Sequence, residues 1–422
     1  MTNKIAIHGL GYVGLTAAVH WAKAGWTVYA YDRDPHVIQA LRKGAPRASE
    51  FLSYLNADVA RLVDEGLILP THTFGDTLAA SVHSIAIPTE KDGVPWDDGI
   101  IALLNDLIHA MAGEGTILVE STLTPGTIDL MLFSAAGPRI LPHIAVCPRR
   151  DWFADASLNL ETLDRIVGGL TPEATERAVE LLSTISKGPI HRCTYREAEY
   201  TKALENAWLH TLVMLPTELA INKPDVDINR VVEMASTHWR LPTIFLGAGC
   251  GGRCVPLGTK YLLEASGVGG IFEAVNTTER HIRLHVAEAI ARRVREAQYK
   301  RVLILGIGYR PNFRDAGLSP GLDVAKYLRN DFGIEVCLAD PMWTPHELAN
   351  LTGFEVAPPA PLGFGAVFLA TPHAEYLDFP ALDADWSKTK FVMDAQGAWS
   401  RFEDTFRTRG IEYKRVGSAG WR

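Results

Sequence analysis

The sequence lacks the features that mark membrane, nucleic-acid-binding and disulfide-rich proteins. It contains no run of about 18 or more apolar residues, so we expect no transmembrane helix and no membrane partner. Its 49 acidic residues outnumber its 41 basic ones and give a net charge of −8, which disfavours a general affinity for nucleic acid. Five cysteines among 422 residues are a sparse, odd set that indicates reduced thiols and not a disulfide framework.

A signal-peptide pattern is also missing from the first residues. The chain passes from Met1 directly into a strand-like run, without a charged region, an apolar core and a cleavage site. Together with the cysteine content, this predicts a cytoplasmic protein. What the chain does contain is an ordinary globular balance, with 47% hydrophobic and 21% charged residues, and a length that suggests two or three domains.

Two stretches of the chain alternate between strand-like and helix-like runs. Residues 1–196 contain short runs rich in Ile and Val, such as KIAIHG and TILVEST, separated by amphipathic stretches, and residues 299–422 alternate in the same way from RVLILGIGY onward. Residues 197–298 have a helical pattern with one glycine-dense break. Strands that alternate with helices favour a parallel sheet. The sequence therefore predicts an α/β fold class, with two Rossmann-like parallel-sheet domains joined by a helical middle domain.

A glycine motif near the N-terminus predicts a dinucleotide site. Gly9, Gly11 and Gly14 form a GxGxxG pattern between a strand and a helix, and Asp32 ends the next strand 18 residues after Gly14. In this arrangement the glycines allow a tight turn, close approach of a pyrophosphate and helix–strand packing, while the acid can bond ribose hydroxyls, which favours NAD over NADP. The adjacent Arg33 could soften that preference. The predicted cofactor-binding residues of this region are Gly9, Gly11, Tyr12, Val13, Gly14, Asp32 and Arg33.

A second glycine-rich segment, residues 249–256, contains Cys250 and Cys254. Such glycine density permits sharp turns close to a ligand, and Arg253 gives Cys254 an electropositive neighbour that favours a thiolate. We interpret Cys254 as a covalent nucleophile, with a glycine-rich hinge that carries an incidental thiol as the alternative. A metal site is disfavoured, because two thiols without a histidine nearby in the sequence fall short of the usual four zinc ligands.

Lys202 and Asn206 lie four residues apart in a helical stretch and therefore share a face. Lys202 could act as a base or an oxyanion stabiliser, and Asn206 as a neutral hydrogen-bond donor. The spacing alone equally fits a solvated helix face, on which Glu199 would be a surface partner of Lys202.

Taken together, the chain resembles the UDP-glucose/GDP-mannose dehydrogenase family nearly from end to end. The likeness rests on the opening IAIHGLGYVGL, the ESTLTPGT turn at 120–127, the K-x-x-x-N helix at 202–206, the GGRCVP loop at 251–256, and GIGYRPN at 306–312 with the later TPH and VMD segments.

The resemblance implies oxidation of the C6 alcohol of a nucleotide sugar by NAD, through a thiohemiacetal and a thioester on Cys254, to a uronic acid. It further implies that Lys202 and Asn206 support the oxyanion and water, and that Thr122 lies near the hydride path. We add Thr89 and Thr122 to the predicted cofactor-binding residues. The predicted substrate-binding residues are Arg149, Lys202, Asn206, Gly251, Gly252 and Arg310. The spacing from Cys254 to Tyr261 leans toward a UDP-N-acetylhexosamine.

The chain departs from the family pattern at two acidic positions. Arg149 stands where the family usually has a glutamate, and Gly258 where it has an aspartate. Loss of a general base typically costs about 10²–10⁴-fold in rate, so water activation is in question unless Asp151 or Glu199 compensates. Two alternatives stay open: an enzyme that stops at another oxidation stage or uses another nucleotide-linked alcohol, and a non-catalytic protein that binds NAD or nucleotides.

The domain boundaries that we predict are 1–196 for the NAD-binding domain, 197–298 for the central helical domain and 299–422 for the nucleotide-sugar-binding domain. The central section is rich in Leu and Ala and includes Trp208, so it offers an apolar face beyond what one domain would cover. We therefore expect a homodimer, as the family resemblance also implies.

Overall fold

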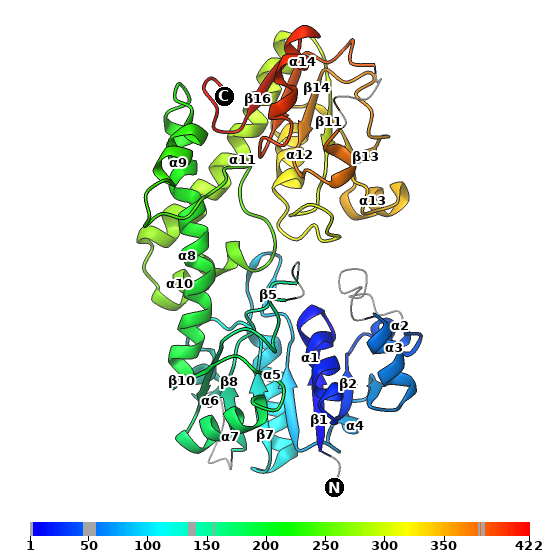
Figure 1. Ribbon diagram of the computed structural model, residues 1–422, viewed down its shortest axis with the longest axis vertical. Helices are drawn as coiled ribbons and strands as arrows, with labels where there is room; N and C mark the ends of the chain where they lie inside the picture. The colour runs from blue at the N-terminus through cyan, green and yellow to red at the C-terminus, as the bar shows by residue number, and fades with distance from the viewer. Residues whose placement is uncertain are drawn as a thin grey trace. The chain divides into compact units, whose positions relative to one another are not determined.

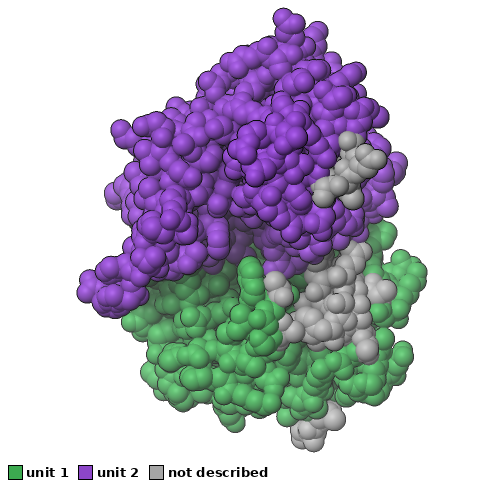
Figure 2. Space-filling model, turned by 45° about the horizontal axis from the view of Figure 1, so that its top comes forward, with its two compact units in different colours: residues 1–205, 264–267 green, residues 206–263, 268–422 purple. Residues whose placement is uncertain are grey.

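The computed structural model describes residues 3–44, 56–133, 141–153, 155, 157–378, 380 and 385–422. The chain forms two compact units, shown in different colours in Figure 2: residues 1–205 with 264–267, and residues 206–263 with 268–422. The boundary between them falls within the long helix α8 (Tyr195–Asn222). The division into three domains at 196 and 298 stays a prediction.

Unit 1 is built on an eight-stranded sheet in the order β10-β9-β8-β7-β4-β1-β2-β3, in which only the β8–β9 pair is antiparallel. The strands are β1 (Lys4–His8), β2 (Thr27–Tyr31), β3 (Ile68–Thr71), β4 (Val82–Ile85), β7 (Thr116–Val119), β8 (His143–Val146), β9 (Arg165–Gly169) and β10 (Ile190–Thr194). The helices are α1 (Tyr12–Lys23), α2 (Pro35–Arg42), α3 (Asn56–Asp64), α4 (Phe74–Thr77), α5 (Asp98–Met111), α6 (Thr127–Phe133) and α7 (Pro172–Leu182). A small hairpin consists of β5 (Glu90–Lys91) and β6 (Val94–Pro95).

The central strands of this sheet are apolar on both faces because helices cover both. Successive side chains of β7 point to opposite faces, so Leu118 joins one core cluster with Ile5 and Ile7, while Ile117 and Val119 join another. All of these side chains are buried. The strand order reverses direction between β1 and β4, and in such sheets ligands bind beyond the carboxyl ends of the strands at that point.

Unit 2 carries a six-stranded, all-parallel sheet in the order β13-β12-β11-β14-β15-β16 (Figure 1). The strands are β11 (Arg301–Leu305), β12 (Glu335–Ala339), β13 (Glu355–Val356), β14 (Ala366–Leu369), β15 (Phe391–Asp394) and β16 (Glu412–Arg415). Besides most of α8, its helices are α9 (Ile228–Ala235), α10 (Val255–Ser266), α11 (Gly270–Glu296), α12 (Pro320–Asn330), α13 (Pro345–Thr352) and α14 (Glu403–Thr408). Two parallel sheets with a helical section between them in the chain confirm the predicted fold class.

The two sheets repeat one local geometry after their first strands. Gly9 follows β1 with φ of +90°, and Gly306 follows β11 with φ of +83°. Asp32 accepts a hydrogen bond from the N–H of Leu10 at 2.9 Å, and Asp340 accepts one from Ile307 at 2.7 Å. The difference lies in the next segment, because α1 starts at residue 12, whereas α12 starts only at residue 320 after a long loop.

Candidate active site

The predicted dinucleotide loop has the backbone that close phosphate approach requires. A Cβ on Gly9 would lie 2.6 Å from the carbonyl oxygen of the residue after β4, and one on Gly14 would lie 1.7 Å from the carbonyl oxygen of Gly9. Gly11 precedes α1, and a Cβ there would meet nothing within 4 Å. Tyr12 and Val13 form the first turn of α1, whose backbone N–H groups and dipole favour an anion. The loop therefore leaves open space in front of a helix N-terminus.

Asp32 is held at the end of β2 by two backbone donors. Its Oδ2 accepts from the N–H of Leu10, and its Oδ1 accepts from Asp34 at 2.9 Å. The carboxylate is half-buried and next to the exposed Arg33. Each oxygen retains acceptor capacity for a ribose hydroxyl. The residues present thus fit a bound NAD, although contact with the ribose remains a prediction.

Two threonines of the predicted site contact each other across the ends of β4 and β7. The hydroxyl of Thr89 donates to the carbonyl oxygen of Thr122 at 2.5 Å. One residue earlier, the hydroxyl of Ser121 accepts from the N–H of Ile87 at 3.0 Å and donates to its carbonyl oxygen at 2.8 Å. The structure therefore brings Thr89 and Thr122 together, in a segment tied to the switch point of the sheet.

Arg149, which we predicted to bind substrate, is buried inside unit 1. Its guanidinium pairs with Glu120 at 2.9 Å and with Asp151 at 2.6 Å, and its side chain is 4% exposed. Asp151 itself is 3% exposed. This geometry argues against a substrate contact by Arg149. Because Asp151 is paired with Arg149, its carboxylate is also not free to act as a base on water.

Glu199, the other candidate replacement base, is also engaged. Its carboxylate accepts hydrogen bonds from the N–H of Gly126 at 2.9 Å and of Ile128 at 3.0 Å, at the start of α6. The residue is 1% exposed. Burial, which outweighs these hydrogen bonds, raises the pKa of Glu199 to about 7. Its observed contacts are those of a helix cap and not of a base that reaches a substrate.

Lys202 lies on α8 in a small charged group. Its Nζ is 3.5 Å from Glu205 Oε2, and Arg150 Nη2 is 2.9 Å from Glu205 Oε1. The Lys202 side chain is 14% exposed. One helical turn later, Asn206 is half-buried, so the two predicted residues share a face of α8 as their spacing indicated.

Gly258 packs directly against α8, which explains the absence of an acidic side chain there. A Cβ on Gly258 would lie 2.4 Å from the backbone nitrogen of Ala207 and 2.6 Å from Cβ of Asn206. Real Cβ atoms essentially never approach so closely. An aspartate at this position would require α8 and α10 to move apart.

Cys254 is exposed and stands at the N-terminus of α10. Its carbonyl oxygen accepts the N–H of Gly258 at 3.2 Å, which makes it the capping residue of this helix. The helix dipole and the neighbouring Arg253 both favour negative charge on the sulfur. By contrast, burial raises the pKa of Cys147 to about 12 and that of Cys250 well above its ordinary value.

The loop from β11 to α12 covers the two glycines before Cys254. A Cβ on Gly251 would lie 2.5 Å from Cβ of Tyr309, and one on Gly252, whose φ is +81°, would lie 3.0 Å from the Tyr309 ring. The N–H of Gly252 donates to the carbonyl oxygen of Gly317 at 2.8 Å. Burial raises the pKa of Tyr309 to about 12, the charge of Arg310 opposes this shift, and the charges of Cys254 and Asp315 add to it.

Arg310, the predicted phosphate contact, lies in the same loop. Its guanidinium stacks on the ring of Phe313 at 3.8 Å and lies 5.9 Å from the ring of Tyr309. Unit 2 therefore brings Gly251, Gly252 and Arg310 together around the segment that leads to Cys254.

Buried His210 and Glu279 and half-buried Cys250 have ligand atoms within 4.8 Å of one another and could by distance hold a metal ion. Glu279 already pairs with the guanidinium of Arg283, and His210 bonds Thr259 at 2.9 Å and Glu279 at 3.2 Å. Both Glu279 oxygens also accept from the N–H of Cys250, at 2.9 and 3.0 Å. We interpret the group as a polar network that holds the loop ahead of Cys254.

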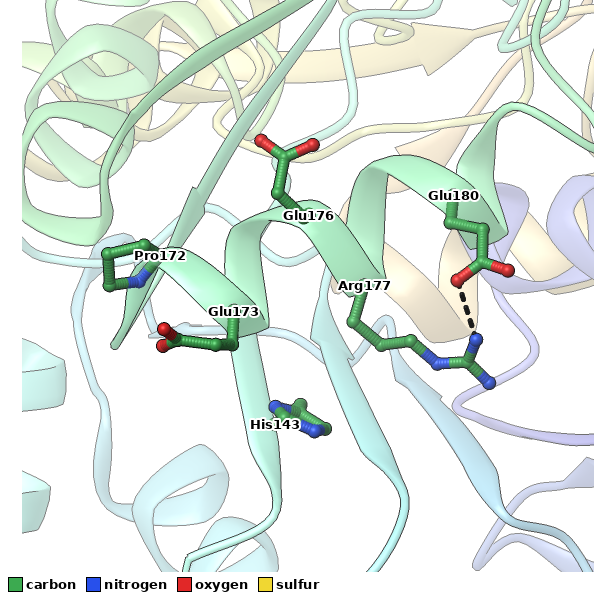
Figure 3. A pocket seen from close by; sticks show the side chains of 6 residues that line it. All are labelled: His143, Pro172, Glu173, Glu176, Arg177 and Glu180. Atoms are coloured by element: carbon green, nitrogen blue, oxygen red, sulfur yellow. Dashed lines mark hydrogen bonds and ion pairs between the residues drawn. The ribbon is translucent and has the colours of Figure 1, made fainter.

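A surface depression on α7 contains none of the predicted site residues (Figure 3). It is lined by His143, Pro172, Glu173, Glu176, Arg177 and Glu180. Arg177 pairs with Glu180 at 2.7 Å, and both side chains are exposed, so the depression has the character of a solvated helix face.

The sequence analysis missed Tyr309 and Glu279. Tyr309 lies inside the GIGYRPN segment, so a signal was present, but its packing against Gly251 depends on tertiary structure. Glu279 is one acid in a long amphipathic helix, and nothing in its local sequence marks it as buried.

Three profiles of one family match the chain in order: the NAD binding domain at residues 3–186, the central domain at 196–280 and the UDP binding domain at 303–401. The chain belongs to the UDP-glucose/GDP-mannose dehydrogenase family. This membership confirms the predicted enzyme class, an NAD-dependent nucleotide-sugar dehydrogenase, and NAD as its cofactor. Among the described residues, no helix is long and apolar enough to cross a membrane; the cytoplasmic location stays a prediction.

Curated relatives include the UDP-N-acetyl-D-mannosamine dehydrogenase of Methanococcus aeolicus, which is 24% identical over 98% of this chain and 95% of the relative. The enzyme of that name from Pyrococcus horikoshii is 26% identical over 88% of this chain and 90% of the relative. Among solved structures, the UDP-N-acetyl-mannosamine dehydrogenase from Staphylococcus aureus superposes with a TM-score of 0.84 at 22% identity and covers 99% of each chain. At that identity the superposition shows the shared fold.

Proposed function

We propose that this protein uses NAD to oxidise the C6 alcohol of a UDP-linked N-acetylhexosamine, with Cys254 as the covalent nucleophile. The observation that carries the proposal is the exposed thiol at the N-terminus of α10, directly after the glycines that pack against Tyr309 in the loop of Arg310. The names of the relatives support an N-acetylated sugar, and UDP-N-acetyl-D-mannosamine is the substrate that we propose to test first.

Two NAD molecules, bound one after the other at the glycine loop, would each accept one hydride in two successive oxidations. Between them, the Cys254 thiolate adds to the C6 aldehyde and forms a C–S bond, which keeps the carbon attached to the enzyme as a thiohemiacetal. After the second oxidation this carbon is a thioester, and water then breaks the C–S bond, releasing a carboxylate and returning the thiol. Lys202 and Asn206 would donate hydrogen bonds to the C6 oxygen as it gains negative charge.

A second candidate product is favoured by the contacts of the acidic residues. Asp151 is bound to Arg149, Glu199 caps α6, and Gly258 leaves no room for a carboxylate. An enzyme without a general base for the last step would release the aldehyde after one oxidation or accumulate the thioester on Cys254.

The test incubates the protein with NAD and each of UDP-N-acetylmannosamine, UDP-N-acetylglucosamine, UDP-glucose and GDP-mannose, and counts NADH per sugar consumed. Mass spectrometry identifies the sugar product and any adduct on Cys254. We expect two NADH and a uronic acid, loss of activity in Cys254→Ser, and retained activity in the control Cys193→Ser, whose thiol lies on β10. One NADH with an aldehyde, or a stalled thioester, supports the second product. No NADH with any sugar, despite NAD binding, contradicts both.

We also propose that the protein is a homodimer that associates through α8. Several apolar side chains on this helix are exposed, among them Trp208 at 63%, Leu215 at 68% and Leu219 at 46%. These three lie seven and four residues apart and therefore follow one helix face. Exposed apolar area of this kind is typical of a protein–protein contact.

A further inference from the structure

Unit 1 contains a buried group of four charged side chains beneath the dinucleotide loop. Glu120, Arg149, Asp151 and Arg165 have side chains that are 0%, 4%, 3% and 1% exposed. Buried charges are costly unless they are paired and hydrogen-bonded. Two acids and two arginines balance in charge.

Arg149 is the member of the group that uses every N–H donor it has. Its Nε and Nη2 bond the two oxygens of Asp151, at 2.6 and 2.8 Å. Its Nη1 donates to Glu120 at 2.9 Å. The two remaining donors go to α1: Nη1 to the carbonyl oxygen of Val13 at 3.1 Å, and Nη2 to the hydroxyl of Thr16 at 3.0 Å. Five donors therefore have five acceptors.

The two contacts on α1 fall on its first turn and the residue that follows. Val13 is the second residue of the helix, directly after the glycine loop. The Thr16 hydroxyl that accepts from Arg149 also contacts the carbonyl oxygens of Tyr12 and Val13, each at 2.8 Å. The guanidinium fork and this hydroxyl together fix the turn whose N–H groups face the pyrophosphate in a dinucleotide site.

We infer that Arg149 is a positioning residue for NAD, which holds the first turn of α1 in place for the cofactor's pyrophosphate. The inference rests on the proposed NAD site at the glycine loop. The effect is geometric, since the charge of Arg149 is matched by Glu120 and Asp151. Burial works against these charges, but the two acids raise the pKa of Arg149, and Arg149 lowers the pKa of Asp151, so Arg149 and Asp151 stay ionised at neutral pH.

This role also accounts for the arginine at a position where an acid was expected. A side chain that reaches α1 needs length and several donors, which a guanidinium has and a carboxylate lacks. Asp151 then supplies the matching acceptor two residues later on the same segment. Arg149 and Asp151 therefore support helix α1 by hydrogen bonds, instead of supplying an acid or a base to the reaction.

Arg165 provides a control, because it belongs to the same buried group and, within the described residues, makes no hydrogen bond to α1. It donates to the carbonyl oxygen of Cys147 at 3.3 Å and lies 3.6 Å from Glu120. Removal of either arginine leaves a buried acid without part of its partner and should lower the melting temperature. Only removal of Arg149 should loosen the first turn of α1.

The experiment measures NAD and UDP affinity by calorimetry for the full-length wild type, Arg149→Met and Arg165→Met, with melting temperatures alongside. We expect Arg149→Met to weaken NAD binding about tenfold or more, equivalent to about 1.4 kcal/mol, while UDP affinity is unchanged. Arg165→Met, which loses one hydrogen bond and one longer ion pair, should lower the melting temperature less and weaken NAD binding less than threefold. Equal weakening by both variants would overturn the positioning role, and so would no weakening by Arg149→Met.

Two further variants keep the inference testable if Arg149→Met does not fold. Thr16→Val removes the hydroxyl that Arg149 bonds and should weaken NAD binding two- to fivefold with little effect on the melting temperature. Arg149→Lys keeps the charge but loses the fork, and should bind NAD as weakly as Arg149→Met. NAD affinity in Arg149→Lys equal to that of wild type would show that charge and not geometry matters, and overturns the inference. A wild type that fails to bind NAD overturns the glycine-loop site itself.

Discussion

His8 and His83 form a buried pair between β1 and β4. Both are 0% exposed, Nε2 of His8 lies 3.0 Å from Nδ1 of His83, and the rings stack with centroids 5.3 Å apart. Burial, and then the charge of His83, lowers the pKa of His8 to about 3, while burial lowers the pKa of His83 to about 4. Both rings are therefore neutral at pH 7, and the N–H of one ring donates a hydrogen bond to the ring nitrogen of the other.

This pair predicts a loss of stability in mild acid. An unfolded histidine titrates near pH 6.5, so below that pH the unfolded chain binds protons that the folded pair excludes. The stabilisation is complete above pH 6.5 and falls as the pH drops toward 4, by about 2 kcal/mol per histidine at pH 5. The double variant His8→Ile, His83→Val should lose less stability than wild type between pH 8 and pH 5 in urea unfolding. Equal losses would contradict the prediction.

Comparison with the double variant is needed because Glu199 acts in the opposite direction. Its folded pKa of about 7 lies above the ordinary 4.5, so its contribution to stability is largest in acid and falls as the pH rises from 4.5 to 7. Wild type and variant share Glu199, and the difference between their pH profiles isolates the histidines.

Single residues differ in how far the sequence could predict their position. The roles of Gly9 and Gly14 follow in part from local geometry, because Gly9 has a positive φ and a Cβ on Gly14 would meet the carbonyl oxygen of Gly9 within the same turn. The close approach of Ala86 to Gly9 comes from a distant strand end and could not be read from the motif. Arg149 could not be placed, since its partners Val13 and Glu120 lie 136 and 29 residues away in the chain. A charged residue after a strand suggests a ligand contact until its buried partners are known.

Among the elements, the loop before α10 and the loop from β11 to α12 are locked together by glycines. A Cβ on Gly251 would meet Cβ of Tyr309 at 2.5 Å and Cδ of Pro320 at 2.9 Å. These atoms lie on or beside the backbone and cannot turn away as the end of a long side chain can. The position of Cys254 therefore depends on close contact between the two loops.

We predict that Gly251→Ala separates these loops. Overpacking of this kind typically costs about 1–3 kcal/mol, and the displaced loop should also change the rate at which iodoacetamide alkylates Cys254. Gly247→Ala is the matched control, because its Cβ would lie 3.7 Å from Gln396, an ordinary contact. Melting temperature, NADH production and alkylation rate together test the prediction. Equal changes of these three quantities in Gly247→Ala and Gly251→Ala would contradict the prediction.

The pattern of elements was predictable where periodicity is strong. Alternation of Ile-rich and Val-rich runs with amphipathic helices identified both parallel sheets, because strands buried on both faces must be apolar. The loop between β11 and α12 has no periodic pattern, so its contacts could not be predicted from the sequence. Ile307 and Gly308 of this loop donate hydrogen bonds to Asp340 at the end of β12, which His373 also contacts, and these contacts depend on how the long loop folds back.

At the scale of the whole molecule, the chain divides at α8, near residue 205, which differs from every boundary that composition indicated. A helix of 28 residues shows no break in its sequence pattern where compact units meet, and Pro216 lies inside it. Composition can show where alternating strands and helices give way to a helical pattern, but the division into compact units follows tertiary contacts. The family profiles give a third division, which follows homology.

The last prediction concerns assembly through α8. Trp208→Glu combined with Leu215→Glu places two charges on the exposed apolar face, where burial in a dimer would desolvate them. We expect light scattering after gel filtration to report a dimer for wild type and a monomer for this variant, with the helical circular dichroism of each preserved. Leu351→Glu, an exposed position of 54% on α13, is the control and should stay dimeric. A wild type that is monomeric at micromolar concentration, or a control that dissociates equally, would rule out α8 as the dimer contact.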